Sequence, residues 1–132
     1  MDTSETYIKM CEKAEEIQAE WKPFNGDYII QNNYFILPGE LQQPVALHFC
    51  NDSKLLNFNR KDFIWLPRQD QLQEMVKRED ESNRASVRKF VDWCFSIKEL
   101  YGWSMEQLWL AFVMKKNNKT WDGEAWNLTI RK

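Results

Sequence analysis

FIWLPRQDQLQ, residues 63–73, is the stretch in which the chain changes from strand to helix. Its first four residues are apolar and β-prone, and Pro67 ends the run because proline cannot donate a hydrogen bond within a sheet. Asp70 and Gln73 fit a capping box, which predicts that a helix starts at Asp70. Three polar side chains at this junction either tie the helix start in place or form a recognition site: Arg68, Gln69 and Gln71.

Before this stretch, the chain consists of short β-rich runs separated by turn residues. The predicted strands are 28–31, 34–37, 45–50, 55–58 and 63–66. Asn32 and Asn33 tolerate positive φ, so they predict a tight hairpin between the first two runs. Because the runs leave no room for crossover helices, we expect a small antiparallel sheet that could curl into a barrel.

An amphipathic helix is expected at the N-terminal end, over residues 5–21. Its apolar positions follow one stripe: Tyr7, Met10, Cys11, Ala14, Ile17 and Trp21. Asp2 and Glu5 fit a capping box at the start of this helix. Pro23 requires the helix to end, because proline disfavours the α region in the residue before it.

The C-terminal half carries helical patterns. After a charged loop over residues 79–84, an apolar stripe widens nearly around the next helix, through Val87, Phe90, Val91, Trp93, Cys94, Phe95, Ile97, Leu100 and Tyr101. A helix so apolar is expected to be central in the core, and Gly102 is expected to end it in a left-handed conformation. Ser104 with Gln107 predicts the capped start of a last helix, which runs to about Lys116.

A hairpin is predicted to close the chain. Asp122-Gly123 is a turn pair with an aromatic residue on each side, Trp121 and Trp126. The two indoles are expected to pair across the turn and to pack back on the helix that contains Leu108 and Phe112. The alternative is that they stand free as an aromatic contact site. The fold class is therefore α+β: an N-terminal helix, a small antiparallel sheet, and C-terminal helices closed by a hairpin.

Composition limits the classes of protein to consider. The 132 residues are 43% hydrophobic, which suffices for a core in a single domain over residues 1–132. With a net charge of −2, the chain lacks the excess of Lys and Arg that a sequence-independent grip on nucleic acid or on an anionic membrane needs. The N-terminus lacks a signal-peptide profile, and no apolar run is long enough to cross a bilayer, so we expect a cytoplasmic protein without membrane contact.

Few residues have catalytic or metal-binding potential. The three cysteines are scattered without a C-x-x-C pair, which indicates reduced thiols, and we expect no metal site and no cofactor. His48, Cys50 and Asp52 could share one strand face, but i,i+2 side chains usually stand parallel and do not form a hydrogen-bonded line. Nucleotide-binding and metalloprotease motifs are missing, which disfavours those enzymes.

The chain has seven tryptophans, more than a core of this size requires. Three lie beside turns or loops, where part of each ring could reach solvent: Trp65, Trp121 and Trp126. Such rings can stack on the bases of single-stranded nucleic acid when a basic track accompanies them. The C-terminal end has a local positive bias from Lys115, Lys116, Lys119, Arg131 and Lys132, so nucleic acid is an alternative partner.

Three segments of the chain form one combined pattern: WKP at 21–23 with GDY at 26–28, IWLPRQDQLQEM at 64–75, and EQLWLAFVM at 106–114 with WDG at 121–123. Together they resemble small proteins encoded in phages and prophages of bacteria. The resemblance implies a phage or prophage origin and carries no catalytic or binding residue across. We therefore expect a non-enzymatic accessory protein that binds another protein or itself. The alternatives are a nucleic-acid-associated protein and an enzyme of unrecognised type.

Overall fold

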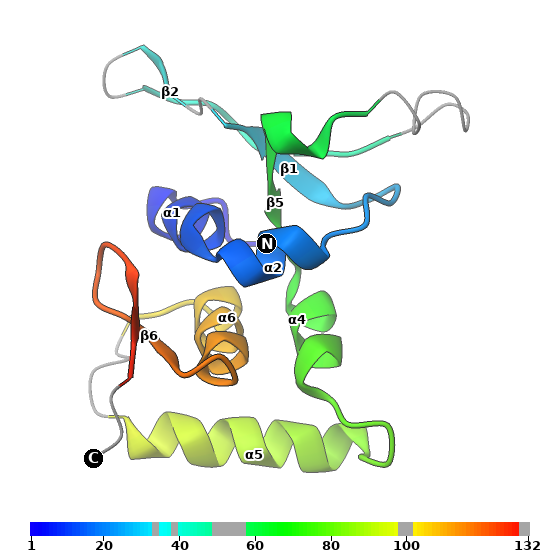
Figure 1. The fold of residues 1–132 in the computed structure, drawn as a ribbon, viewed down its shortest axis with the longest axis vertical. Helices are drawn as coiled ribbons and strands as arrows, with labels where there is room; N and C mark the ends of the chain where they lie inside the picture. Colours follow the sequence, from blue (N-terminus) through cyan, green and yellow to red (C-terminus); the bar gives the residue numbers. More distant parts are fainter. Residues whose placement is uncertain (33–34, 38–39, 49–57, 98–101, 130–132) are drawn as a thin grey trace. The chain divides into compact units, whose positions relative to one another are not determined.

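The computed structural model describes residues 1–32, 35–37, 40–48, 58–97 and 102–129. Residue contacts divide the chain into two compact units, and each is described by itself (Figure 1). The N-terminal unit is residues 3–67, and the C-terminal unit is residues 1–2 with 68–132. The α+β class is confirmed, and the described strands form small antiparallel sheets without a closed barrel. A single domain over residues 1–132 stays a prediction.

Two helices, α1 (Glu5–Lys13) and α2 (Glu15–Glu20), replace the single predicted helix of the N-terminal unit. The break is at Ala14, whose ψ of 73° lies outside the α region. The predicted apolar stripe is nevertheless buried along its whole length. The predicted Asp2–Glu5 capping box is wrong: Ser4 Oγ accepts the hydrogen bond from Tyr7 N at 3.2 Å. Asp2 instead belongs to the C-terminal unit, where its backbone N–H donates to the Glu106 carboxylate.

The main sheet has the strand order β4-β1-β5, with β1 (Tyr28–Gln31) between β4 (Val45–Ala46) and β5 (Phe63–Leu66). Both pairings are antiparallel. The other sheet of this unit pairs β2 (Phe35–Leu37) with β3 (Glu40–Leu41). The predicted hairpin between residues 28–31 and 34–37 is therefore wrong. The physical reason is that Asn32 N donates to Asp62 O at 3.0 Å, which continues the pairing of β1 with the chain before β5.

The other predicted strands differ in length from the observed ones. Of the run 45–50, only β4 is a strand among the described residues, and 49–50 lie outside them. Of the run 55–58, only Phe58 is described, and it is not in a strand.

The core of the N-terminal unit is organised around two stacked indoles. The Trp21 and Trp65 ring centroids are 6.1 Å apart with 7° between the ring planes. Trp21 Nε1 donates to Asp27 Oδ2 at 2.9 Å, and Phe24 N donates to the same oxygen at 3.0 Å. Asp27 is buried, so these hydrogen bonds compensate for the loss of its hydration. They also hold the turn that leads from α2 into β1.

The C-terminal unit contains α4 (Gln69–Val76), α5 (Asn83–Ser96) and α6 (Met105–Lys115), followed by the hairpin of β6 (Lys119–Trp121) and β7 (Trp126–Leu128). The core of this unit lies along α6. Buried residues occur on nearly every side of α6, as the apolar sequence of this helix predicts. The ring of Trp109 stacks on that of Phe90 from α5, with centroids 3.8 Å apart. Edge contacts with Phe112 extend this cluster.

Helix α5 is not the central helix that its wide apolar stripe predicts. Ser86 and Phe90 are the residues of α5 that are buried, whereas Val87, Val91 and Phe95 are exposed. The helix also begins within the predicted loop, because Ser82 Oγ accepts from Ala85 N at 3.1 Å and caps its start. Gly102 has the predicted left-handed conformation, with a φ of 85°, but α5 ends before it, at Ser96.

The predicted capping box of α6 is confirmed. Ser104 Oγ accepts from Gln107 N at 3.1 Å, and Gln107 Oε1 accepts from Ser104 N at 3.2 Å. Ser104 Oγ also donates to Asp2 Oδ2 at 2.5 Å. The Ser104 hydroxyl therefore caps the start of α6 and also binds the side chain of Asp2.

Replacing Ser104 with alanine is expected to destabilise the protein by about 1 kcal/mol, because Gln107 N loses its acceptor at the helix start. Urea unfolding followed by circular dichroism measures this change. Ser104→Thr is the matched control, since threonine keeps the hydroxyl and should retain most of the stability. An unfolding curve of Ser104→Ala that coincides with wild type would place the start of the helix elsewhere.

Candidate functional site

Trp65 is part of the core and not of a surface. It lies on β5, is 5% exposed and stacks on Trp21, so the prediction that its ring reaches solvent is wrong. Gln18 binds the same residue twice: Trp65 N donates to Gln18 Oε1, and Gln18 Nε2 donates to Trp65 O. The loop that follows Trp65 in the sequence favoured an accessible ring, whereas in the structure the ring is covered by the stacked ring of Trp21.

Arg68, Gln69 and Gln71 lie at the start of α4. Gln71 Oε1 accepts from Arg68 N at 2.8 Å, and Arg68 Nε donates to Asp70 Oδ1 at 3.1 Å. The predicted box of Asp70 with Gln73 is therefore wrong, because the helix begins earlier and Gln71 is three residues after the cap residue Arg68. Arg68 and Gln71 thus have the helix-start role that was one of their two predicted roles, and Gln69 is half-buried beside them.

Trp121 and Trp126 pair across the C-terminal hairpin, as predicted. They are partners in the β6–β7 register, and their ring centroids are 5.1 Å apart. Asp122 Oδ1 accepts from both Glu124 N and Ala125 N at 2.8 Å. These backbone hydrogen bonds, with a further one from the Asn127 side chain, lower the pKa of Asp122 and keep the turn closed. Trp121 is 9% exposed and Trp126 is half-buried, so the pair packs back and does not stand free.

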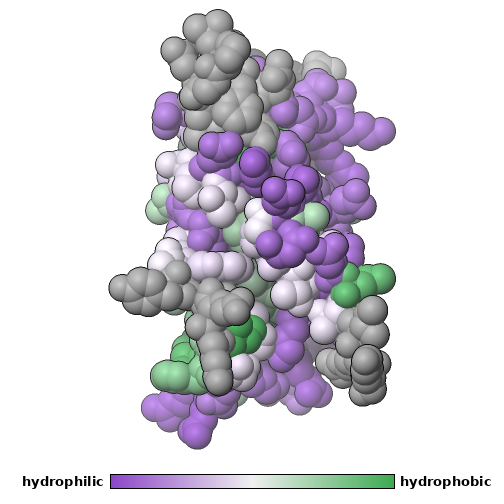
Figure 2. Space-filling view, turned by 90° about the vertical axis from the view of Figure 1, so that its left-hand side faces the viewer, coloured by the Kyte–Doolittle hydropathy of each residue, from purple (hydrophilic) through white to green (hydrophobic). Residues whose placement is uncertain are grey.

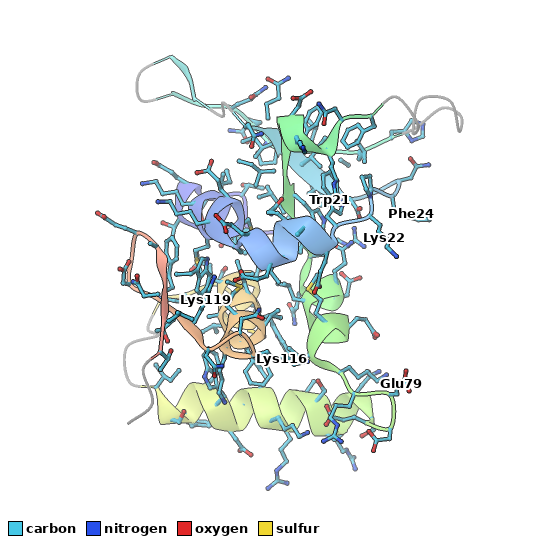
Figure 3. All side chains as sticks on the ribbon, in the orientation of Figure 1. Trp21, Lys22, Phe24, Glu79, Lys116 and Lys119 are labelled. Carbon is cyan, nitrogen blue, oxygen red and sulfur yellow. The ribbon has the colours of Figure 1, made fainter. Side chains whose placement is uncertain are left out.

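Trp121 also lines an aromatic cavity of about 160 Å³ within the C-terminal unit. Trp93 and Trp103 form other parts of its wall, and Lys115 and Lys119 contribute the cations. Lys119 and the neighbouring Lys116 are labelled in Figure 3, at β6 and just after α6. This arrangement joins tryptophans to part of the predicted basic track, whose last two members, Arg131 and Lys132, lie outside the described residues.

The question of a Cys–His–Asp group stays open. His48 is exposed, and Cys50 and Asp52 lie outside the described residues. Of the other cysteines, Cys11 is fully buried and Cys94 is half-buried, and burial raises the pKa of the Cys94 thiol. No group of three or more His, Cys, Asp and Glu side chains that could hold a metal occurs within the described ranges.

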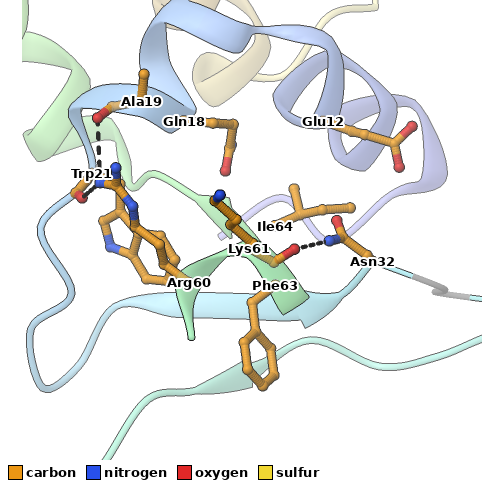
Figure 4. A pocket seen from close by; sticks show the side chains of 9 residues that line it. All are labelled: Glu12, Gln18, Ala19, Trp21, Asn32, Arg60, Lys61, Phe63 and Ile64. Carbon is orange, nitrogen blue, oxygen red and sulfur yellow. Dashed lines mark hydrogen bonds between the residues drawn. The ribbon is translucent and has the colours of Figure 1, made fainter. Parts of the chain in front are cut away.

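A hollow of about 310 Å³ with polar and apolar lining residues lies in the N-terminal unit (Figure 4). Arg60 Nη1 donates to Trp21 O at 2.8 Å and to Ala19 O at 3.3 Å, and it thereby caps the C-terminal end of α2. Asn32 Nδ2 donates to Lys61 O. Burial raises the pKa of Glu12, which lines the same hollow. The guanidinium and amide groups of this hollow hold α2 and β1 in place, so its chemistry is structural.

Helix α5 carries an exposed apolar surface that the sequence did not predict. Phe95 is 85% exposed, and Val91 and Val87 precede it at four-residue intervals, so the three project on successive turns of one side. Arg84 and Arg88 are exposed on the same side, at spacings of seven from Val91 and Phe95. We call these five residues the α5 surface. The spacing alone predicts an apolar face, but it cannot tell whether the core or solvent lies against it.

Figure 1 shows why this surface is open. Helices α4 and α6 lie on one side of α5, and no described element of the C-terminal unit lies on the other side. The face in Figure 2 is mostly hydrophilic or intermediate, with smaller green areas, one of them in the lower part of the view. Exposed apolar side chains gathered in this way are typical of an interaction surface.

No protein-family model, curated protein or solved structure matches this chain. The resemblance of three segments to phage and prophage proteins therefore stays a prediction. Among the described residues, no helix combines the length and the apolar character needed to cross a membrane.

Proposed function

We propose that this chain is a non-catalytic accessory protein of a phage or prophage, and that it binds an acidic amphipathic segment of another protein through the α5 surface. The observation that carries the proposal is Phe95, an aromatic side chain exposed in line with Val91 and Val87. Covering such a ring stabilises a complex by about 1.5–3 kcal/mol. Exposed aromatic residues of this kind are typical anchors of protein interfaces. The resemblance to phage proteins supports the origin.

Charge selects the kind of partner. Arg84 and Arg88 lie beside the apolar residues, while Asp92 is the single carboxylate of α5. A segment with glutamate or aspartate next to apolar side chains would match both parts of the surface. A second copy of the chain matches less well, because two such surfaces would bring Arg84 and Arg88 together with the same cations.

A synthetic helical peptide tests the proposal. It carries leucines at intervals of three and four residues with glutamates and alanines elsewhere, and a second peptide has lysine in place of each glutamate. Fluorescence anisotropy should show that the acidic peptide binds and the basic one does not. Binding should weaken at least about tenfold in Val91→Ser/Phe95→Ser and in Arg84→Glu/Arg88→Glu. Val45→Ser, which changes an exposed valine on β4, is the matched control and should bind as wild type does.

Four outcomes would contradict the proposal. Equal binding of both peptides, or binding that neither double variant weakens, would remove the α5 surface as the site. A dimer in sedimentation that Phe95→Ser abolishes would replace the partner with a second copy. Salt-dependent binding of a single-stranded oligonucleotide that Lys119→Ala weakens would favour the nucleic-acid alternative at the aromatic cavity.

A further inference from the structure

The aromatic cavity of the C-terminal unit is lined from four parts of the chain. Its wall includes one residue each from α5, the segment before α6, α6 itself and β6: Trp93, Trp103, Ala111 and Trp121. Three of the seven tryptophans therefore meet at one cavity of about 160 Å³. An apolar cavity of about 150 Å³ accommodates one benzene ring. The volume of the aromatic cavity thus matches a single six-membered ring.

Each tryptophan of this wall is held in place by its surroundings. The ring centroid of Trp93 lies 5.3 Å from that of Phe112, and the Trp121 centroid lies 5.1 Å from that of Trp126. Trp103 directly precedes the capping box that fixes the start of α6. Trp93 and Trp103 are half-buried, so they are not sealed in the core. A ligand would therefore enter a wall that is already formed, which reduces the entropy lost on binding.

Charge limits which ligands fit the aromatic cavity. Its described lining contains two cations, Lys115 and Lys119, and no carboxylate. Indole faces by themselves attract cations, so a cage of tryptophans alone would favour a positively charged ligand. Here the two ammonium groups would repel such a ligand. The lysines thus exclude one class of ligand, while the indoles provide the surface on which a ring would bind.

We infer that the aromatic cavity binds a small molecule through one planar aromatic ring that carries no positive charge. The ring lies against the indoles of Trp93, Trp103 and Trp121, because aromatic rings make favourable stacked and edge contacts with one another. This site is separate from the α5 surface. Trp93 is two residues from both Val91 and Phe95, so it lies on the opposite side of α5. The inference therefore does not depend on the proposed function.

Titration of the full chain with benzyl alcohol, followed by two-dimensional proton–nitrogen NMR, tests the inference. Replacing one tryptophan at a time with phenylalanine assigns the indole N–H signals. The signals of Trp93, Trp103 and Trp121 should shift with a common Kd of roughly 1 mM, as expected for a ligand of this size. The signals of Trp21 and Trp65, in the N-terminal unit, are internal controls and should not move.

Two further ligands and two variants test the chemistry of the cavity. Cyclohexylmethanol, which lacks the aromatic ring, and benzylammonium, which adds a positive charge, should each bind at least about threefold more weakly than benzyl alcohol. Ala111→Leu should weaken binding at least about tenfold because the larger side chain fills the cavity, and its thermal stability should equal or exceed that of wild type. Trp103→Leu should also bind more weakly, since it keeps an apolar side chain but loses the ring. Ala85→Leu, at an exposed position of α5, is the matched control and should bind as wild type does.

The inference would be overturned if the Trp93, Trp103 and Trp121 signals of the wild-type protein stay in place at about ten times the expected Kd. Unchanged binding by folded Ala111→Leu or Trp103→Leu would place the ligand elsewhere. Equal binding of cyclohexylmethanol would remove the aromatic ring as the recognised group, and tighter binding of benzylammonium would reverse the assigned charge. A single-stranded oligonucleotide that shifts the same indole signals and binds far more tightly than benzyl alcohol would replace the small molecule with nucleic acid.

Discussion

Replacing Trp121 and Trp126 together by alanine is expected to destabilise the protein by about 3–5 kcal/mol, since burial of large aromatic side chains is lost. Most of the loss should come from Trp121, which is 9% exposed on β6 and lines a cavity with Ala111 of α6. Trp126 is half-buried and contributes mainly through its ring contact with Trp121. Urea unfolding of the two single variants and the double variant, followed by circular dichroism, measures each share.

Leu128→Ala is the matched control for this pair. Leu128 lies on the same hairpin, in β7, but is 70% exposed, so its removal should change the free energy of unfolding little. A double tryptophan variant that is as stable as wild type but no longer binds a peptide or an oligonucleotide would contradict the structural role. The hairpin would then become the leading functional site.

Trp109→Ala is expected to have a similarly large effect, a loss of about 3–5 kcal/mol. Trp109 is 1% exposed, and its ring stacks on Phe90 at a centroid distance of 3.8 Å. Truncation would leave a cavity between α5 and α6 that the helices cannot fully close. Urea unfolding again measures the change, and a loss below about 1 kcal/mol would contradict the position of α6 in the core.

Trp109→Phe separates the ring contact from the indole nitrogen. Trp109 Nε1 is buried and has no hydrogen-bond partner among the described residues, so phenylalanine removes an unsatisfied donor while keeping an aromatic ring against Phe90. Its loss of stability should be less than half that of Trp109→Ala. Equal losses for the two variants would show that the ring stack contributes little.

The sequence by itself determined the features that depend on residues close together in the chain. The stripe from Tyr7 to Trp21 repeats every three or four residues and is buried as predicted. Ser104 and Gln107 are three residues apart and form the predicted capping box. Trp121 and Trp126 face each other because the Asp122-Gly123 turn between them sets their register. The capping box and the tryptophan pair each form between residues that are at most five positions apart, and the stripe is a repeat of three or four residues, so local stereochemistry predicts all three patterns.

Only the tertiary structure decided which strands pair and which helix side is covered. β1 pairs with residues 45–46 and 63–66 and not with the next strand in the sequence. The reason is that long-range backbone hydrogen bonds, such as that from Asn32 N to Asp62 O, continue its pairing with the chain before β5. The apolar residues of helix α5 lie on more than one side of it, so its periodicity is compatible with more than one buried side. Packing on α6 selects the side with Ser86 and Phe90, which leaves Phe95 exposed. The α5 surface is therefore a product of packing between elements, and no spacing within the chain specifies it.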